Sequence, residues 1–234
     1  MLARLYGYGE EYKIVWFKHG TPEGAGLGGG RGGSRADAVK LACNISRARS
    51  HIIELALCNN WEWFVTLTLD GSKQSRVDLD GYVKDLGNWI GNFNKKYDCK
   101  LKYLLIPEQH KDGKSWHMHG LLHDVPEKAL TVNEHGYFDI PYYRDRFGFI
   151  SLSRIRDRAR CARYITKYVS KSLTDRANDA GKHLYYASRG LLGRVQVADL
   201  HCMPVPDDAY QNDYTASKWY TNHEEVAAIL EQYS

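Results

Sequence analysis

Two histidines spaced two residues apart are the first residues in this chain whose chemistry the sequence suggests. His117 and His119 lie in the apolar segment 116–122, which reads as a strand. Because residues two apart in a strand point to the same face, the two imidazoles would project together. Ten histidines in 234 residues make one such pair common by chance, so the neighbouring residues decide whether it means anything.

A carboxylate is expected beside this pair. Glu108 lies at the end of the preceding apolar segment, and a turn at 110–114 would make the two segments a hairpin. Two imidazoles and one carboxylate leave open positions for water and substrate oxygens, a set that suits Mg²⁺ or Mn²⁺ with a phosphate and also Zn²⁺. Gln109 and His110 compete with Glu108 as the third ligand, and the hairpin register decides among them.

A second group of reactive side chains lies on an expected helix. At about 100° per residue, Tyr164, Lys167, Tyr168 and Lys171 share one sector, while apolar residues occupy another. A phenol is a poor nucleophile at neutral pH because it is protonated. Adjacent ammonium groups favour its ionisation and also neutralise charge on a phosphorane-like transition state.

Positive charge is concentrated in residues 144–171. This stretch holds nine basic and two acidic residues, a charge of +7, whereas the rest of the chain carries −3. Aromatic residues lie among these cations and add stacking to charge, which favours a polyanion as the partner. The arginines expected to contact a phosphate backbone are Arg154, Arg156, Arg158, Arg160 and Arg163.

The elements that must position these groups alternate in type along the chain. Apolar and β-branched segments predict strands, and three- and four-residue spacings predict helices. Strands are expected at 12–18, 61–69, 101–106 and 116–122, and helices at 34–58, 80–97 and 157–173. We therefore expect an α+β fold with a central antiparallel sheet of ferredoxin or RRM-like type, helices on one side and the active site on the other.

Composition excludes several classes of protein. With 43% hydrophobic and 26% charged residues the chain is typical of globular proteins, and no apolar run approaches the roughly 20 residues of a membrane span. Five cysteines without a Cys-x-x-Cys pair indicate reduced thiols in a cytoplasm. The glycine-rich stretch 20–33 lacks a phosphate-binding loop motif and reads as a flexible loop.

Three motifs, in this order, resemble the HUH endonuclease superfamily, specifically the rolling-circle replication initiators of small single-stranded DNA phages and plasmids. They are FVTLT at 64–68, EQHKDG at 108–113 leading into HMH at 117–119, and YITKYVSK at 164–171. The order of histidines before tyrosines differs from that of conjugative relaxases. The paired tyrosines resemble the microvirus gene A type, and the spacing between Gly113 and His117 is one residue longer than in eukaryotic circular viruses.

The resemblance implies roles for particular residues. His117, His119 and Glu108 would hold a divalent metal ion, Mg²⁺ or Mn²⁺. Tyr164 and Tyr168 would be the nucleophiles that nick single-stranded origin DNA, and Lys167 and Lys171 would orient the phosphate. The product would be a 5′-phosphotyrosine link with a free 3′-OH, and the strand would later be rejoined. A host helicase and DNA polymerase in a bacterial cytoplasm would be partners, with no membrane involved.

Length favours a single domain over 1–234. Within it we expect an N-terminal arm at 1–33, an endonuclease core at 61–173 and a C-terminal extension at 176–234. Two other functions remain open from the residues alone. One is a non-catalytic RRM-like nucleic-acid-binding module, which needs no metal and forms no covalent product. The other is a zinc-dependent hydrolase that uses only the His/Glu cluster.

Overall fold

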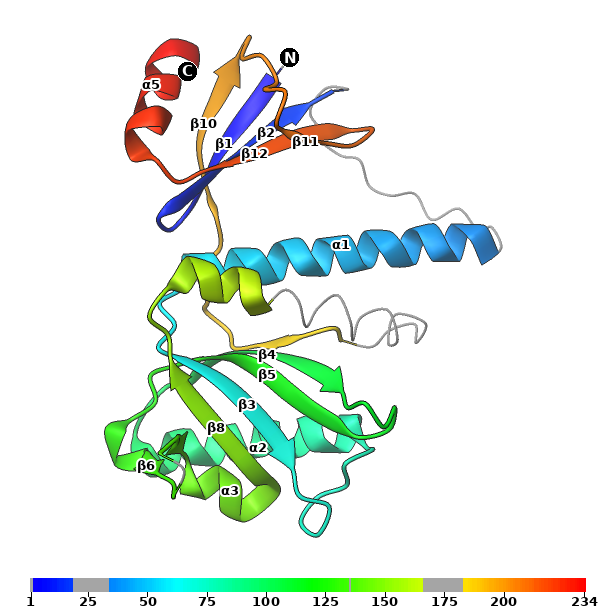
Figure 1. Ribbon diagram of the computed structural model, residues 1–234, viewed down its shortest axis with the longest axis vertical. Helices are drawn as coiled ribbons and strands as arrows, with labels where there is room; N and C mark the ends of the chain where they lie inside the picture. The colour runs from blue at the N-terminus through cyan, green and yellow to red at the C-terminus, as the bar shows by residue number, and fades with distance from the viewer. Residues whose placement is uncertain (1, 19–33, 135, 166–182) are drawn as a thin grey trace. The chain divides into compact units, whose positions relative to one another are not determined.

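The chain folds into two compact units, formed by residues 1–37 with 192–234 and by residues 38–191. We describe a computed structural model, shown as a ribbon in Figure 1. The described residues are 2–18, 34–134, 136–165 and 183–234. Both ends of the chain, which the sequence suggests as an arm and an extension, contribute to the first unit.

The first unit is an antiparallel sheet with one helix. Its strand order is β10-β1-β2-β12-β11, so strands from the two chain ends pair directly. The elements are β1 (Leu2–Tyr8), β2 (Glu11–Phe17), β10 (Val195–His201), β11 (Tyr210–Gln211), β12 (Thr215–Tyr220) and α5 (His223–Tyr233). Leu5, Ile14 and Trp16 are fully buried in its core with Val226 of α5. The expected strand 12–18 corresponds to β2, while β1 was not anticipated.

The second unit is built around a seven-stranded sheet of order β6-β7-β8-β3-β5-β4-β9. Its central elements follow one another as β3 (Trp63–Leu69), α2 (Leu79–Tyr97), β4 (Lys102–Gln109), β5 (Trp116–His123), α3 (Pro141–Phe147) and β8 (Gly148–Arg154). The short elements are η1 (Glu127–Ala129), β6 (Thr131–Val132), β7 (Phe138–Asp139) and β9 (Tyr186–Ala187). The four central strands lie in the order β8-β3-β5-β4, all antiparallel. With α2 and α3 this is the βαββαβ arrangement of ferredoxin-like folds, which confirms the α+β prediction.

One face of this sheet packs against α2 and α3. The α2 helix begins where Asp78 accepts a hydrogen bond from the Gly81 amide at 2.9 Å. Its apolar side buries Trp89 and other large side chains against the sheet. Tyr82 of α2 and Tyr143 of α3 join their hydroxyls at 2.7 Å within this core. The buried hydroxyls thus satisfy each other.

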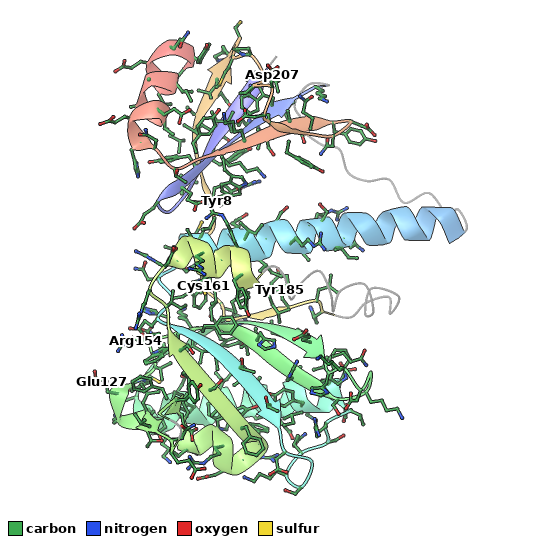
Figure 2. The ribbon with its side chains drawn as sticks, viewed as in Figure 1. Tyr8, Glu127, Arg154, Cys161, Tyr185 and Asp207 are labelled. Carbon is green, nitrogen blue, oxygen red and sulfur yellow. The ribbon has the colours of Figure 1, made fainter. Side chains whose placement is uncertain are left out.

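The opposite face carries further helices, whereas the sequence suggests helices on one side only. There, α1 (Ser34–Cys58) and the helical residues 158–165 pack on β4 and β5 through an apolar cluster. The fully buried members include Ile52, Ala56 and Ile165. Cys161 and Tyr185 pack against the same cluster and are labelled in Figure 2. The helix that bears Tyr164 is therefore held on the face to which His117 and His119 point.

Candidate metal centre and tyrosine helix

Three donor groups converge on the face of the sheet opposite α2. Oε2 of Glu108 lies 3.1 Å from Nε2 of His117 and 2.9 Å from Nε2 of His119. One ligand atom from each residue lies within 4.8 Å of the others. The three side chains are only 10–19% exposed. We call Glu108, His117 and His119 the metal cluster, since their donor set and convergence fit a divalent cation.

The register of the β4–β5 hairpin brings the cluster together. Glu108 lies directly opposite His117, and Ile106 opposite His119, so residues 106 and 108 share the face of the histidines. Gln109 belongs to the other set of the alternation, and its side-chain amide donates to the Gly113 carbonyl at 2.6 Å. Of the competing third ligands, Glu108 is thus the one that lies beside the pair.

His110 lies at the rim of the cluster. Its ring centroid is 5.7 Å from that of His117, and its side chain is 49% exposed. It does not belong to the converging group of donor atoms. The structure therefore places His110 beside the cluster, whereas the sequence left it as a competing ligand.

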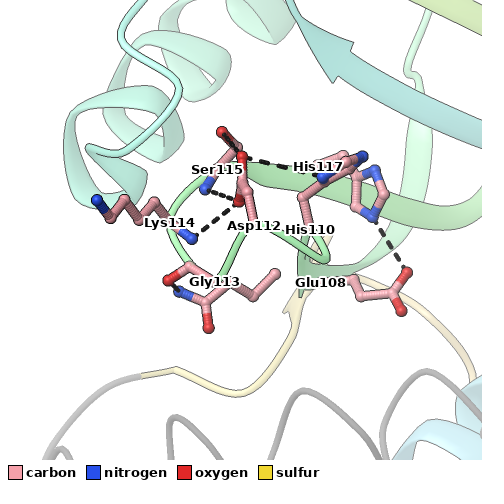
Figure 3. A network of polar contacts seen from close by, with 8 residues as sticks. Glu108, His110, Asp112, Gly113, Lys114, Ser115 and His117 are labelled. Atoms are coloured by element: carbon pink, nitrogen blue, oxygen red, sulfur yellow. Dashed lines mark hydrogen bonds and ion pairs between the residues drawn. The ribbon is translucent and has the colours of Figure 1, made fainter.

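The loop that closes the hairpin is fixed by Asp112 (Figure 3). Its carboxylate accepts hydrogen bonds from the amides of Lys114 and Ser115 at 2.9 and 2.8 Å, and from the Ser115 hydroxyl at 2.6 Å. These bonds, led by that of the Ser115 hydroxyl, hold the pKa of Asp112 well below its ordinary value. Gly113 supplies the positive φ of the turn. The loop thereby sets the register on which the cluster depends.

A hydroxyl from the neighbouring strand orients one imidazole. Oγ1 of Thr66 on β3 lies 3.1 Å from Nδ1 of His119, on the side of the ring away from Glu108. Burial, followed by the charge of His117, lowers the pKa of His119 below its ordinary value. The neutral imidazole is the form that binds a metal ion. Sequence analysis assigns Thr66 no role, although its alternation along 63–69 places it on the same face as the histidines once β3 pairs with β5.

Phe64 connects the metal cluster to the helix that bears Tyr164. Its ring stacks beside His119 with centroids 6.1 Å apart and meets the edge of Tyr164 at 5.6 Å. Tyr164 is 45% exposed, so its phenol is accessible while one side of the ring is packed. Sequence analysis also gives Phe64 no individual role. The pairing of β3 with β5 supplies the signal for it.

The helix that bears Tyr164 begins as the sequence predicts. Asp157 accepts from the amide of Arg160 at 2.8 Å through its side chain and from that of Cys161 at 3.1 Å through its backbone. Ala162 and Ile165, expected on its apolar side, are buried. The other three expected site residues of this helix, Lys167, Tyr168 and Lys171, lie outside the described residues.

The arginines expected to contact nucleic acid are all exposed. They are Arg154, Arg156, Arg158, Arg160 and Arg163. The guanidinium of Arg154, labelled in Figure 2, lies 4.7 Å from the ring centroid of Trp63, and Arg158 donates to the side chain of Asn60. The preceding basic residues Arg144 and Arg146 pair with carboxylates. The basic residues after β8 therefore contribute more to an exposed positive surface than those of α3.

The fold and site define an α+β domain with a candidate metal centre on an antiparallel sheet and a tyrosine on the adjoining helix. Such a combination can polarise a phosphate and attack it. Among the described residues, no helix is long and apolar enough to cross a membrane. The four cysteines with described side chains, Cys58, Cys99, Cys161 and Cys202, are free thiols.

Comparison with known proteins gives one match. Residues 62–173 match the model of a family described as replication-associated protein of the ORF2 type. The matched segment, just under half of the chain, runs from β3 past Tyr164 and contains the metal cluster. No curated protein and no solved structure matches the chain. The family match supports a Rep-like protein of rolling-circle replication.

Proposed function

We propose that this chain initiates rolling-circle replication by nicking single-stranded DNA at an origin, as an HUH endonuclease of the two-tyrosine type. The observation that carries the proposal is the position of Tyr164. Phe64 contacts both this tyrosine and His119, so a phenol and a metal cluster are held on one face of one sheet. The family match over the same residues supports a role in replication.

The reaction is a transfer of a phosphoryl group from DNA to tyrosine. The oxygen of Tyr164 or Tyr168 attacks the scissile phosphorus and loses its proton, and the bond from phosphorus to the 3′ oxygen breaks. The 3′ oxygen takes up a proton and leaves as a free 3′-OH, while the 5′ phosphate stays on the tyrosine. Because the phosphotyrosine preserves the energy of the broken bond, rejoining of the strand needs no ATP.

Glu108, His117 and His119 would hold the divalent cation, Mg²⁺ or Mn²⁺. When bound, such a cation supplies Lewis-acid polarisation of the phosphate oxygens. The protein contributes a neutral imidazole at His119, through its lowered pKa, and a ring orientation set by Thr66. Lys167 and Lys171 would orient the phosphate and stabilise its developing charge.

The partners follow from the reaction. Single-stranded origin DNA is the substrate, and the exposed arginines between 154 and 163 would contact its backbone. A host helicase would open the duplex and a host polymerase would extend the 3′-OH. If these arginines bind phosphates, replacing two of them by alanine lowers the salt dependence of DNA binding, because fewer counterions are released. An unchanged slope would argue against this assignment.

The test is formation of a covalent adduct. The full chain is incubated with a pool of labelled single-stranded DNA and Mn²⁺, and the products are separated under denaturing conditions. We expect a protein–DNA adduct that EDTA and His117→Ala abolish, with the linked peptide containing Tyr164 or Tyr168. Tyr214→Phe, which changes a tyrosine that is 74% exposed in the other unit, should form the adduct normally.

Two results would contradict the proposal. An adduct that persists in the double variant Tyr164→Phe, Tyr168→Phe would show that other nucleophiles act. Absence of an adduct, with DNA bound equally well in EDTA, would favour the non-catalytic binding module.

A further inference from the structure

The metal cluster is one end of a row of side chains that crosses four strands. The register places Glu108 of β4 opposite His117 of β5, His117 opposite Thr68 of β3, and Thr68 opposite Phe149 of β8. Residues directly opposite in antiparallel strands point to the same face. Phe149 therefore shares a face with the metal cluster, two strand spacings, or about 10 Å, from His117.

Phe149 is an exposed aromatic on an otherwise regular strand. Along β8, Ile150 and Leu152 are buried, whereas Phe149, Ser151 and Ser153 are exposed. The Phe149 side chain is 66% exposed, although the other large apolar residues of this strand are at most 7% exposed. Burial in the described fold thus does not account for a phenylalanine at this position.

We propose that Phe149 is a stacking platform for a nucleobase of the same DNA strand whose phosphate is held at the metal cluster. The inference rests on the proposed function and adds a subsite to it. Every base has a π-face that can stack on an aromatic ring, largely independently of sequence. The distance from Phe149 to the cluster is short enough for a few nucleotides of an extended strand to contact both.

The surroundings of Phe149 favour a nucleotide over an apolar protein segment. Its neighbours on the same face are hydroxyl residues, Ser151 on its own strand and Thr66 and Thr68 on β3. A protein-docking surface has a contiguous apolar patch. A single ring flanked by hydroxyls instead matches a base with its sugar and phosphate, which accept hydrogen bonds from Ser and Thr.

The experiment compares two strands that differ only in their bases. One is an oligothymidylate, and the other has the same length and backbone with a tetrahydrofuran abasic unit at every position. Binding to the full chain is measured by fluorescence anisotropy in EDTA, where no strand transfer takes place. The variants are Phe149→Ala, Phe149→Leu, which keeps apolar bulk without a π-face, and Phe149→Trp. Tyr210→Ala is the control for an exposed aromatic, since Tyr210 is 70% exposed.

We expect Phe149→Ala to weaken oligothymidylate binding by about 5- to 150-fold, the range for loss of one base–aromatic contact. Phe149→Leu should show most of this loss, and Phe149→Trp and Tyr210→Ala little of it. Binding of the abasic strand should be the same for all variants. An equal loss on both strands, or no loss on oligothymidylate, would overturn the stacking platform.

Adduct formation separates this inference from the proposed function. If the wild-type chain forms the metal-dependent adduct while Phe149→Ala binds oligothymidylate like wild type, the stacking platform is wrong and the nickase stands. If the wild-type chain forms no adduct and binds neither strand, both are wrong.

Discussion

Replacement of Thr66 by valine should weaken metal binding without disturbing the metal cluster's own side chains. Valine keeps the branched shape that a strand favours and removes only the hydroxyl. A metal ion at the cluster would take the lone pair of His119 Nε2, which faces Glu108. The proton of the neutral ring is then on Nδ1, and Thr66 Oγ1, 3.1 Å away, accepts it.

The structure sets the expected magnitude. His119 is only 8% exposed, so water does not readily replace the lost acceptor. A buried donor left without a partner costs about 1–3 kcal/mol, which corresponds to roughly 5- to 150-fold in the dissociation constant. Loss of comparable partners of metal-bound histidines typically costs about 10- to 100-fold in metal affinity. We therefore expect a loss of about that size.

Isothermal titration with Mn²⁺ measures the effect. Thr66→Ser, which restores an oxygen, should bind close to wild type. Thr68→Val is the matched control, because Thr68 lies opposite His117 on the same strand and face and, among the described residues, is bonded to neither histidine. If Thr66→Val binds Mn²⁺ within about twofold of wild type while Glu108→Ala loses binding, Thr66 does not orient His119.

Three further predictions concern titration, reactivity and packing. In the metal-free protein the NMR titration midpoint of His119 should lie below about 6.5, because burial lowers its pKa; as pH falls below that value the unfolded chain takes up this proton first and folding loses stability, and a higher midpoint would contradict the burial. Burial also raises the pKa of Cys161 to about 11, so iodoacetamide at neutral pH should modify the exposed Cys202 well before Cys161, and equal rates by mass spectrometry would argue against helix packing on the sheet. Gly120→Ala would place a Cβ 2.4 Å from a β4 carbonyl oxygen and should lower the free energy of unfolding in urea by about 1–3 kcal/mol; Gly87→Ala, in open space on α2, should not lower it, and equal behaviour of the two would contradict the register.

The sequence is sufficient for the local features of the site. The alternation of segment 116–122 places His117 and His119 on one face, because side chains in a strand alternate regardless of the partner strand. The start of the helix at Asp157 and its buried Ala162 and Ile165 follow in the same way from periodicity and capping. The α+β class follows from the same alternation of expected strands and helices.

Other features depend on pairings between distant segments, which local periodicity does not contain. Glu108 joins the histidines because Asp112 closes the hairpin in one register, and a shift of one residue would turn Gln109 to that face instead. The pairing of β3 with β5 and β8 determines the contacts of Thr66 and the place of Phe149. The sequence alone thus determines which side chains can take part, and tertiary pairing decides which of them meet, because strand register is set by the whole sheet.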